Sequence, residues 1–355
     1  MKSILKIAVT GAALAATLCG GLQAAWYDDV TFKGDMRYRF ETIDDASDRT
    51  RHRLRLRYGA YGKVNDSIDY GFRLATGSTT DPVSTNQTLG GDSANKAINL
   101  DLAYADVHVN DSLDFTFGKM KNPFTVVQKS QLIFDGDFTP EGIAGSYDFG
   151  DFYLNSSYFF FDSDRKTTGN AVGTENEGMF GTQLGYSNGP FQVGVAYFDF
   201  ELTGDNESSA VGAHDYNLLN LFVEYNVKLG STGLAFYGDY VNNIGTESTA
   251  ANEDQDSGFG LGVKAKFGSK WKAGIEYRET EKNAVPFNTN GSAFALADSD
   301  FGGGKTDFEG FKFSAAYGVM KNTEIAATYF VNEQDSSTAT PVDYDRFQFD
   351  LKIKF

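Results

Sequence analysis

Apolar and polar residues alternate along most of the chain. The clearest stretch is residues 347–355, Phe-Gln-Phe-Asp-Leu-Lys-Ile-Lys-Phe, in which every second residue is apolar up to Phe355. Successive side chains of a β-strand point to opposite faces, so this pattern predicts a strand with one apolar and one charged face. The same alternation recurs from residue 30 onward. The predicted strands are residues 30–40, 52–60, 68–74, 98–109, 113–117, 143–149, 151–161, 179–186, 191–200, 219–229, 234–241, 259–267, 271–278, 308–317, 325–331 and 344–355.

The connections between these strands alternate between short and long. The short ones, rich in Asn, Asp, Gly, Ser and Lys, are residues 63–67, 110–112, 149–151, 187–190, 230–232, 268–270 and 318–322. The long ones are residues 43–50, 77–96, 120–142, 162–177, 203–214, 242–256, 281–306 and 332–343. Tight turns at one end and long loops at the other, joining about 16 strands, are typical of a transmembrane antiparallel up-and-down β-barrel. We therefore predict an all-β fold with short periplasmic turns and long outer loops.

The first residues predict a secretory signal peptide. Two lysines, Lys2 and Lys6, precede a short apolar run that ends in small residues. We expect cleavage after Ala24 or Ala25, which gives a signal peptide at 1–24 and a single barrel domain at 25–355. The only cysteine, Cys19, lies within the expected signal peptide, so the mature chain has no disulfide or thiolate metal site.

Composition narrows the class of protein. The chain has 31 Phe, 19 Tyr and 39 Gly but only 6 Pro, which suits strands and turns. Its formal net charge of -17 disfavours a nucleic-acid partner. The mean hydropathy of -0.35 disfavours a helical membrane protein but suits a barrel, in which half of each strand is polar.

Two motifs make the sequence resemble the bacterial "putative porin" family of outer-membrane channels. They are Asn-Pro-Phe at 122–124 and Thr-Pro-Glu-Gly at 139–142, and residues 51–59 also look like the family's second strand. The resemblance covers essentially the whole mature chain. It implies passive diffusion of small hydrophilic solutes or ions through the outer membrane of a Gram-negative bacterium, and a homotrimer among outer-membrane lipids and lipopolysaccharide.

The third long connection, residues 120–142, is the expected constriction loop. In porins of this size it folds into the lumen, and here it carries Asp135, Asp137 and Glu141. Rings of charge at a constriction select the ions that pass. The alternative is an ordinary solvated acidic loop.

Basic residues are expected on the lumen wall opposite this loop. They share the polar faces of the first, second, third and last strands: Lys33, Arg37, Arg39, Arg51, Arg53, Arg55, Arg57, Arg73, Lys352 and Lys354. In a closed barrel the last strand pairs with the first, so these residues form one basic wall. A row of arginines repels itself, so it needs water or acidic partners. The plainer alternative is a set of salt bridges to Asp35, Glu41, Asp69 and Asp101 that only holds the wall together.

The sequence offers no catalytic constellation. His52, His108 and His214 are isolated from one another, and no His-rich metal pair or regular calcium loop is present. We expect no enzyme activity, no cofactor and no metal site. The acidic outer loops are expected to aid solubility, or to bind divalent cations that bridge to lipopolysaccharide.

The leading hypothesis is a water-filled diffusion channel with a basic wall facing an acidic constriction loop. The first alternative is a specific channel for phosphate or another oxyanion, because arginine forks suit such ligands. A plugged structural or receptor barrel and an enzymatic barrel are weaker alternatives.

Overall fold

The computed structural model describes residues 30–45, 48–163, 177–202, 216–245, 255–286, 297, 300–301, 306–334 and 342–355. The expected signal peptide lies outside these residues, as do all or part of six of the long loops. Among the described residues, no helix is long and apolar enough to cross a membrane.

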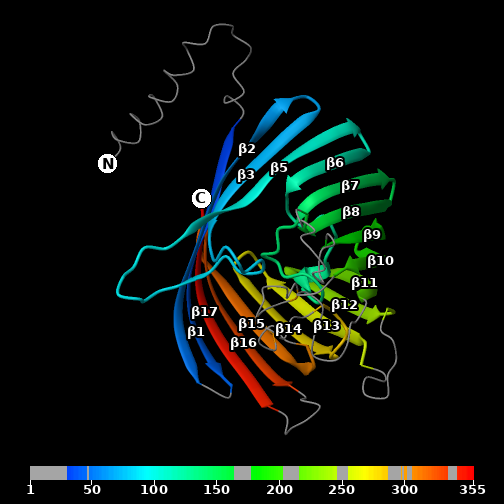
Figure 1. Cartoon of the computed structure of the whole chain (residues 1–355). Coiled ribbons are helices and arrows are strands. Elements are labelled where there is room, and N and C mark those ends of the chain that lie inside the picture. Colours follow the sequence, from blue (N-terminus) through cyan, green and yellow to red (C-terminus); the bar gives the residue numbers. More distant parts are fainter. Residues whose placement is uncertain are drawn as a thin grey trace, which may run out of the picture.

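Antiparallel strands form a single sheet that closes on itself (Figure 1). They are β1 (Thr31–Asp44), β2 (Arg49–Asn65), β3 (Ile68–Thr76), β4 (Gln87–Thr88), β5 (Ile98–Asn110), β6 (Leu113–Lys119), β7 (Glu141–Phe149), β8 (Phe152–Asp162), β9 (Glu177–Asn188), β10 (Phe191–Glu201), β11 (Tyr216–Leu229), β12 (Thr232–Asn243), β13 (Ser257–Phe267), β14 (Trp271–Thr280), β15 (Phe308–Met320), β16 (Thr323–Gln334) and β17 (Val342–Lys354). Each long strand pairs with its sequence neighbours, and β1 pairs with both β2 and β17. Without the two-residue β4, the barrel has sixteen strands, which confirms the predicted fold class.

The alternation seen in the sequence separates the two faces of the wall. In β17, Arg346, Gln348 and Asp350 are buried in the interior, whereas Phe347 and Phe349 are 37% and 41% exposed on the outer face. An outward apolar band and a polar interior are the arrangement that lipid outside and water inside require.

The end of β17 closes the barrel against the start of β1. The Gly34 N–H donates to the Phe355 carbonyl at 2.7 Å, and the Phe355 N–H donates back to the Gly34 carbonyl at 3.0 Å. The Phe355 ring covers Gly34, where a Cβ would collide with it and would lie 2.7 Å from the Arg57 carbonyl oxygen. The absence of a side chain at residue 34 therefore makes room for Phe355.

We expect Gly34→Ala to destabilise the barrel by about 1–3 kcal/mol, because an extra methyl group has no space at this closure. The urea midpoint of unfolding in detergent measures the effect. Gly233→Ala is the matched control, since a Cβ in that strand position meets no atom within 4 Å. Equal midpoints for the two variants would contradict the proposed closure contact.

Candidate functional site

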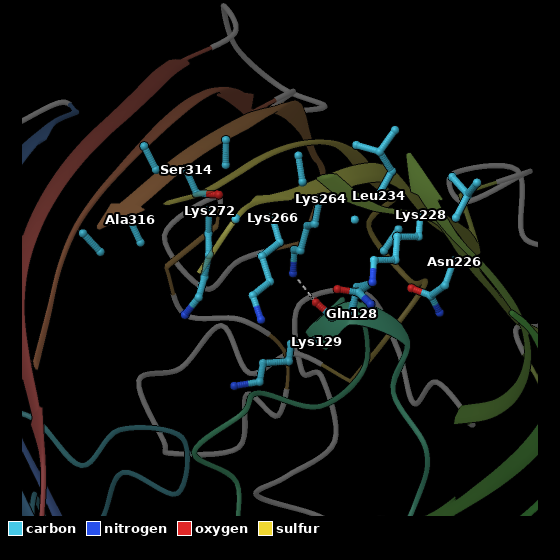
Figure 2. Close-up of a pocket in the computed structure, with 18 of the residues that line it drawn as sticks. Gln128, Lys129, Asn226, Lys228, Leu234, Lys264, Lys266, Lys272, Ser314 and Ala316 are labelled. Atoms are coloured by element: carbon cyan, nitrogen blue, oxygen red, sulfur yellow. Dashed lines mark hydrogen bonds between the residues drawn. The ribbon is translucent and has the colours of Figure 1, made fainter. Parts of the chain in front are cut away.

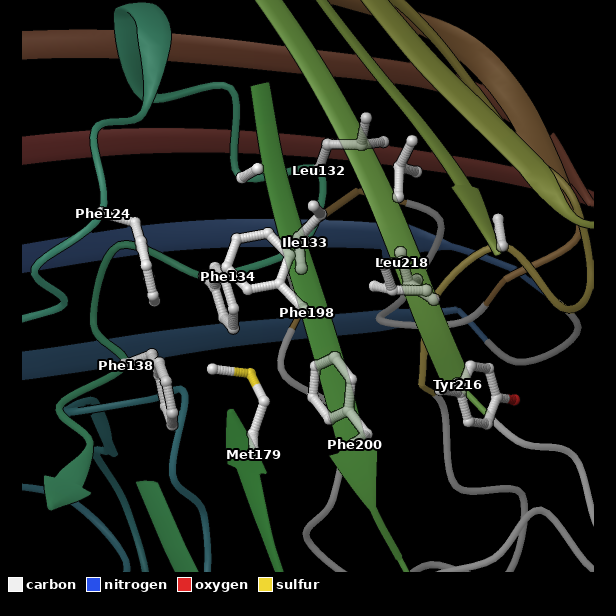
Figure 3. Packing of buried hydrophobic residues seen from close by; sticks show 14 of the residues in the cluster. Phe124, Leu132, Ile133, Phe134, Phe138, Met179, Phe198, Phe200, Tyr216 and Leu218 are labelled. Carbon is white, nitrogen blue, oxygen red and sulfur yellow. The ribbon is translucent and has the colours of Figure 1, made fainter. Parts of the chain in front are cut away.

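The connection between β6 and β7, residues 120–140, folds into the barrel as loop 3. Its apolar residues Phe124, Leu132, Ile133, Phe134 and Phe138 are buried in one cluster with wall residues of β8 to β12 (Figure 3). The ring of Phe124 meets that of Phe198 edge-on at 4.9 Å, and the ring of Phe134 meets it at 5.2 Å. Aromatic pairs of this geometry add about 0.5–1.5 kcal/mol each beyond the burial of area. Loop 3 therefore packs against the inner face of β8 to β12, on one side of the lumen.

Polar contacts fix the middle of loop 3 to the same side. The Gln128 amide donates to Glu224 Oε1 at 2.7 Å, and the Ser130 hydroxyl donates to Asp239 Oδ2 at 2.5 Å. Arg278, paired with Glu276 at 2.6 Å, donates to the Ser130 carbonyl. These carboxylates are buried and each has a partner, so they hold the loop in place rather than present free charge to the lumen.

On the other side, the strand register assembles the basic wall. Arg37 of β1 lies between Lys352 of β17 and Arg55 of β2. One step along the strands, Arg39 lies between Asp350 and Arg53. Cationic side chains therefore continue across three adjacent strands, with carboxylates interspersed.

Loop 3 reaches the basic wall through Asp137. Its Oδ1 atom lies 3.0 Å from Arg57 Nη1 and 3.4 Å from Arg55 Nη1, and Thr85 donates to its Oδ2 at 2.9 Å. Asp35 of β1 binds the same two arginines at 2.8 and 2.9 Å. Burial alone would raise the pKa of the Asp137 carboxyl, but Arg55, Arg57 and Arg37 outweigh burial and hold the pKa below its ordinary value of 3.8.

Nearer the long loops, two carboxylates neutralise a second group of arginines. Glu41 is fully buried and lies 2.5 Å from Arg51, 2.7 Å from Arg346 and 3.7 Å from Arg53. Asp300, from the loop before β15, lies 2.7 Å from Arg346 and 3.0 Å from Arg39. Arg39 also forms a two-bond fork with Asp350 at 2.7 and 3.0 Å.

Two arginines of the wall are compensated less than the rest. Arg37 is 9% exposed and donates to the neutral Asn86 Oδ1 at 2.6 Å, and no described carboxylate lies within 4 Å of it. The one described carboxylate within 4 Å of Arg53 is Glu41, at 3.7 Å. Among the described residues, the buried Nε atoms of both arginines have no acceptor. The wall therefore keeps positive charge beyond what its carboxylates offset.

The profile of the "putative porin" family matches residues 35–212 and 203–355. The chain belongs to this family. No curated protein matches it. A triple mutant of the porin of Rhodopseudomonas blastica is similar in fold, with a TM-score of 0.58 and 14% identity, over 92% of this chain and all of that one. Another mutant of that porin, and a structure described as concerning the asymmetric conductivity of engineered proteins, both match at a TM-score of 0.56 and 15% identity over the same shares.

Most of the basic residues predicted for this porin lie on the lumen side, but they differ in position and in their acidic partners. Arg37, Arg39, Arg51, Arg53, Arg55 and Arg57 form the central wall described above. Arg73 is ion-paired with Asp101. Lys33 and Lys354 are exposed near the short-turn end, with the Lys33 ammonium 5.8 Å from the centre of the Tyr61 ring. Lys352 lies 3.5 Å from Asp350.

The salt-bridge alternative holds for part of the wall. Asp35, Glu41 and Asp101 do pair with wall arginines. Asp69 instead lies 3.6 Å from Lys63 and 3.5 Å from His108.

The three acidic residues predicted for the constriction lie in three different settings, and only Asp137 meets the basic wall. The Asp135 side chain accepts the backbone N–H of Asp137 at 2.7 Å, so it shapes the turn. Glu141 does not belong to the constriction. It begins β7, on the same outward face as the 43% exposed Ile143, and pairs with Lys119 at 3.0 Å. The prediction failed for Glu141 because the strand begins one residue before the predicted end of the loop.

Several lumen residues of the porin have neighbours that no local sequence pattern indicates. Thr85, Asn86 and Asp300 reach the wall from two other long loops. Lys228, Lys264, Lys266 and Lys272 occupy scattered polar positions of three strands, and barrel order alone brings them together. The alternation predicts that each of these lysines faces inward, but only the strand pairing shows that they are neighbours.

The low pKa of Asp137 predicts how loop 3 responds to acid. A carboxyl with a depressed folded-state pKa stabilises its contacts at pH values above 3.8, and this stabilisation is lost as the pH falls through the depressed value. We therefore expect steady single-channel current from neutral pH down to 3.8, with larger current fluctuations at lower pH. Asp137→Asn should show the larger fluctuations at every pH, whereas Asp111→Asn, in a short turn, should behave as wild type. A pH profile of Asp137→Asn that matches wild type would contradict a tether through Asp137.

Proposed function

We propose that this porin is an outer-membrane channel for passive diffusion of small hydrophilic solutes and ions, with the short turns facing the periplasm. The observation that supports this most is the position of loop 3, which is docked on β8 to β12 and reaches the basic wall through Asp137. Such a loop narrows the lumen without blocking it. The charges on the two sides of the narrowed lumen orient the solutes that pass.

The proposed route to the membrane includes removal of residues 1–24 and insertion from the periplasm. The proposed assembly is a homotrimer in contact with lipopolysaccharide. Cross-linking of the protein in native outer membranes tests the assembly, and the expected product is three chains in size.

Liposome swelling tests the diffusion function. Vesicles that contain the full mature chain should swell in isotonic solutions of small sugars, at rates that fall as sugar size increases. Vesicles with heat-unfolded protein are the control. No swelling with any sugar would support the plugged-barrel alternative and would contradict the proposal.

A preference for anions is the second candidate, favoured by the weak compensation of Arg37 and Arg53. The positive charge of these two guanidinium groups is only partly offset and attracts anions into the lumen, and arginine suits oxyanions through its planar fork. Two ion replacements in potassium chloride test this preference. Replacement of chloride by a bulky anion should lower the conductance more than replacement of potassium by a bulky cation. A larger loss of conductance on replacement of the cation, in wild type and equally in Arg55→Glu and Arg57→Glu, would contradict the anion preference.

A further inference from the structure

A cavity of about 960 Å³ lies at the short-turn end of the lumen. Its wall comes from β11 to β17 and the turns 230–231 and 268, and loop 3 contributes Gln128 and Lys129. Six lysines of the described part of the chain line it: Lys129, Lys228, Lys264, Lys266, Lys272 and Lys352. In Figure 2, Lys264, Lys266 and Lys272 extend from the strands into the space that Lys129 enters from the loop.

The lysines of this cavity are poorly balanced by acidic groups. None of the described residues that line it is Asp or Glu. Lys272 pairs with Glu324 at 2.5 Å, Lys352 lies 3.5 Å from Asp350, and Lys264 donates to the Gln128 carbonyl. Within the described part of the chain, Lys129, Lys228 and Lys266 have no carboxylate within 4 Å, and all three are exposed to the lumen.

Two features of the surroundings keep these ammonium groups available. The inward positions between them are occupied by small residues, including Ala235, Ser314, Ala316 and Thr328, so space remains at the centre. On the loop side, Gln128 and Lys129 have φ angles of 45° and 58°, in the left-handed region that non-glycine residues rarely adopt. The surrounding contacts of Gln128 with Glu224 and Lys264 hold this backbone, which presents Lys129 to the cavity.

We propose that the cavity is a binding site for small organic polyanions, molecules with two or more carboxylate or phosphate groups. Ammonium groups act as point charges and select total charge rather than one planar geometry. A cavity of this volume is at the upper end of the roughly 300–1,000 Å³ range of small-molecule sites. One inorganic phosphate is too small to contact lysines on all sides of the cavity at once. A molecule with several separated anionic groups can contact them together.

The site is continuous with the basic wall, and the inference therefore rests on the proposed channel function. Lys352 lines the cavity and is paired in register with Arg37. An anion that passes the arginines therefore meets the lysines next, and the site would concentrate polyanions on the periplasmic side of loop 3.

Citrate is the probe. We expect calorimetry on the detergent-purified full chain to show saturable citrate binding at low salt. In a planar bilayer, citrate added on the short-turn side should block chloride current at lower concentration than citrate added on the other side. Pyrophosphate should compete with citrate, whereas inorganic phosphate and gluconate should bind more weakly.

The triple variant Lys129→Gln, Lys228→Gln and Lys266→Gln should weaken citrate binding by about a hundredfold, because each lost charge weakens binding about fivefold, on the order of 1 kcal/mol in water. Lys266→Gln alone should show part of the loss if the triple variant does not fold. Lys321→Gln, in the short turn before β16, is the matched control and should bind citrate as wild type does. An active channel that binds no citrate, or binds it equally in the triple variant, would overturn this inference and leave the proposed function standing. Citrate binding to a protein without conductance would instead contradict the proposed function alone.

Discussion

Arg37→Glu should lower the ratio of anion to cation permeability by at least about tenfold, because it reverses one charge in a buried position where screening is weak. Arg37 has only the neutral Asn86 as a described hydrogen-bond partner, so its charge is among the least offset in the wall. The introduced carboxylate would lie beside Lys352 and Arg55 and could pair with them, so the fold should tolerate it. The reversal potential in a potassium chloride gradient measures the change.

Arg49→Glu provides the control for Arg37→Glu. It makes the same change of charge on the same kind of residue, at the exposed start of β2 near the long loops. Exposed charges are screened within about 8 Å at physiological salt, so its reversal potential should remain close to that of wild type. An equal shift in both variants would show that total charge, rather than the Arg37 position, sets selectivity.

Glu41→Ala should destabilise the barrel by about 3–5 kcal/mol, the usual cost of removing one partner from a buried ion network. Glu41 is fully buried, and its loss would remove the carboxylate that contacts Arg51 and Arg53 and one of the carboxylates that pair with Arg346. Urea unfolding in detergent, or loss of the compact form on unheated gels, measures this cost.

Glu141→Ala is the counterpart on the outer face. Its side chain is 63% exposed and Lys119 is its one ion-pair partner in the described part of the chain, so its loss should cost at most about 1 kcal/mol. If both glutamates proved equally important to stability, the distinction between a buried network and an outer-face pair would be wrong.

Local alternation was enough to predict the strands and the inward face of β1, β2 and β17. In Arg51, Arg53, Arg55 and Arg57 the spacing of two residues places all four side chains inside, as the structure shows. The position of loop 3 came from the family resemblance, and its apolar residues dock as such a position requires.

The rest depends on contacts between segments that are distant in sequence. Asp300 reaches Arg39 across 261 residues, and Lys129 lines the same cavity as Lys266 only because loop 3 docks inside the barrel. The setting of Glu141 depends on the residue at which β7 begins, and a shift of one residue decides which face a side chain occupies. Periodicity within one strand carries no information on such contacts.

The most direct test of a water-filled lumen with excess positive charge is a single-channel recording of the full mature chain in a salt gradient. We expect stable open steps and a reversal potential of the sign that anion permeation produces. Absence of conductance, or a reversal potential of the cation-selective sign, would contradict this account.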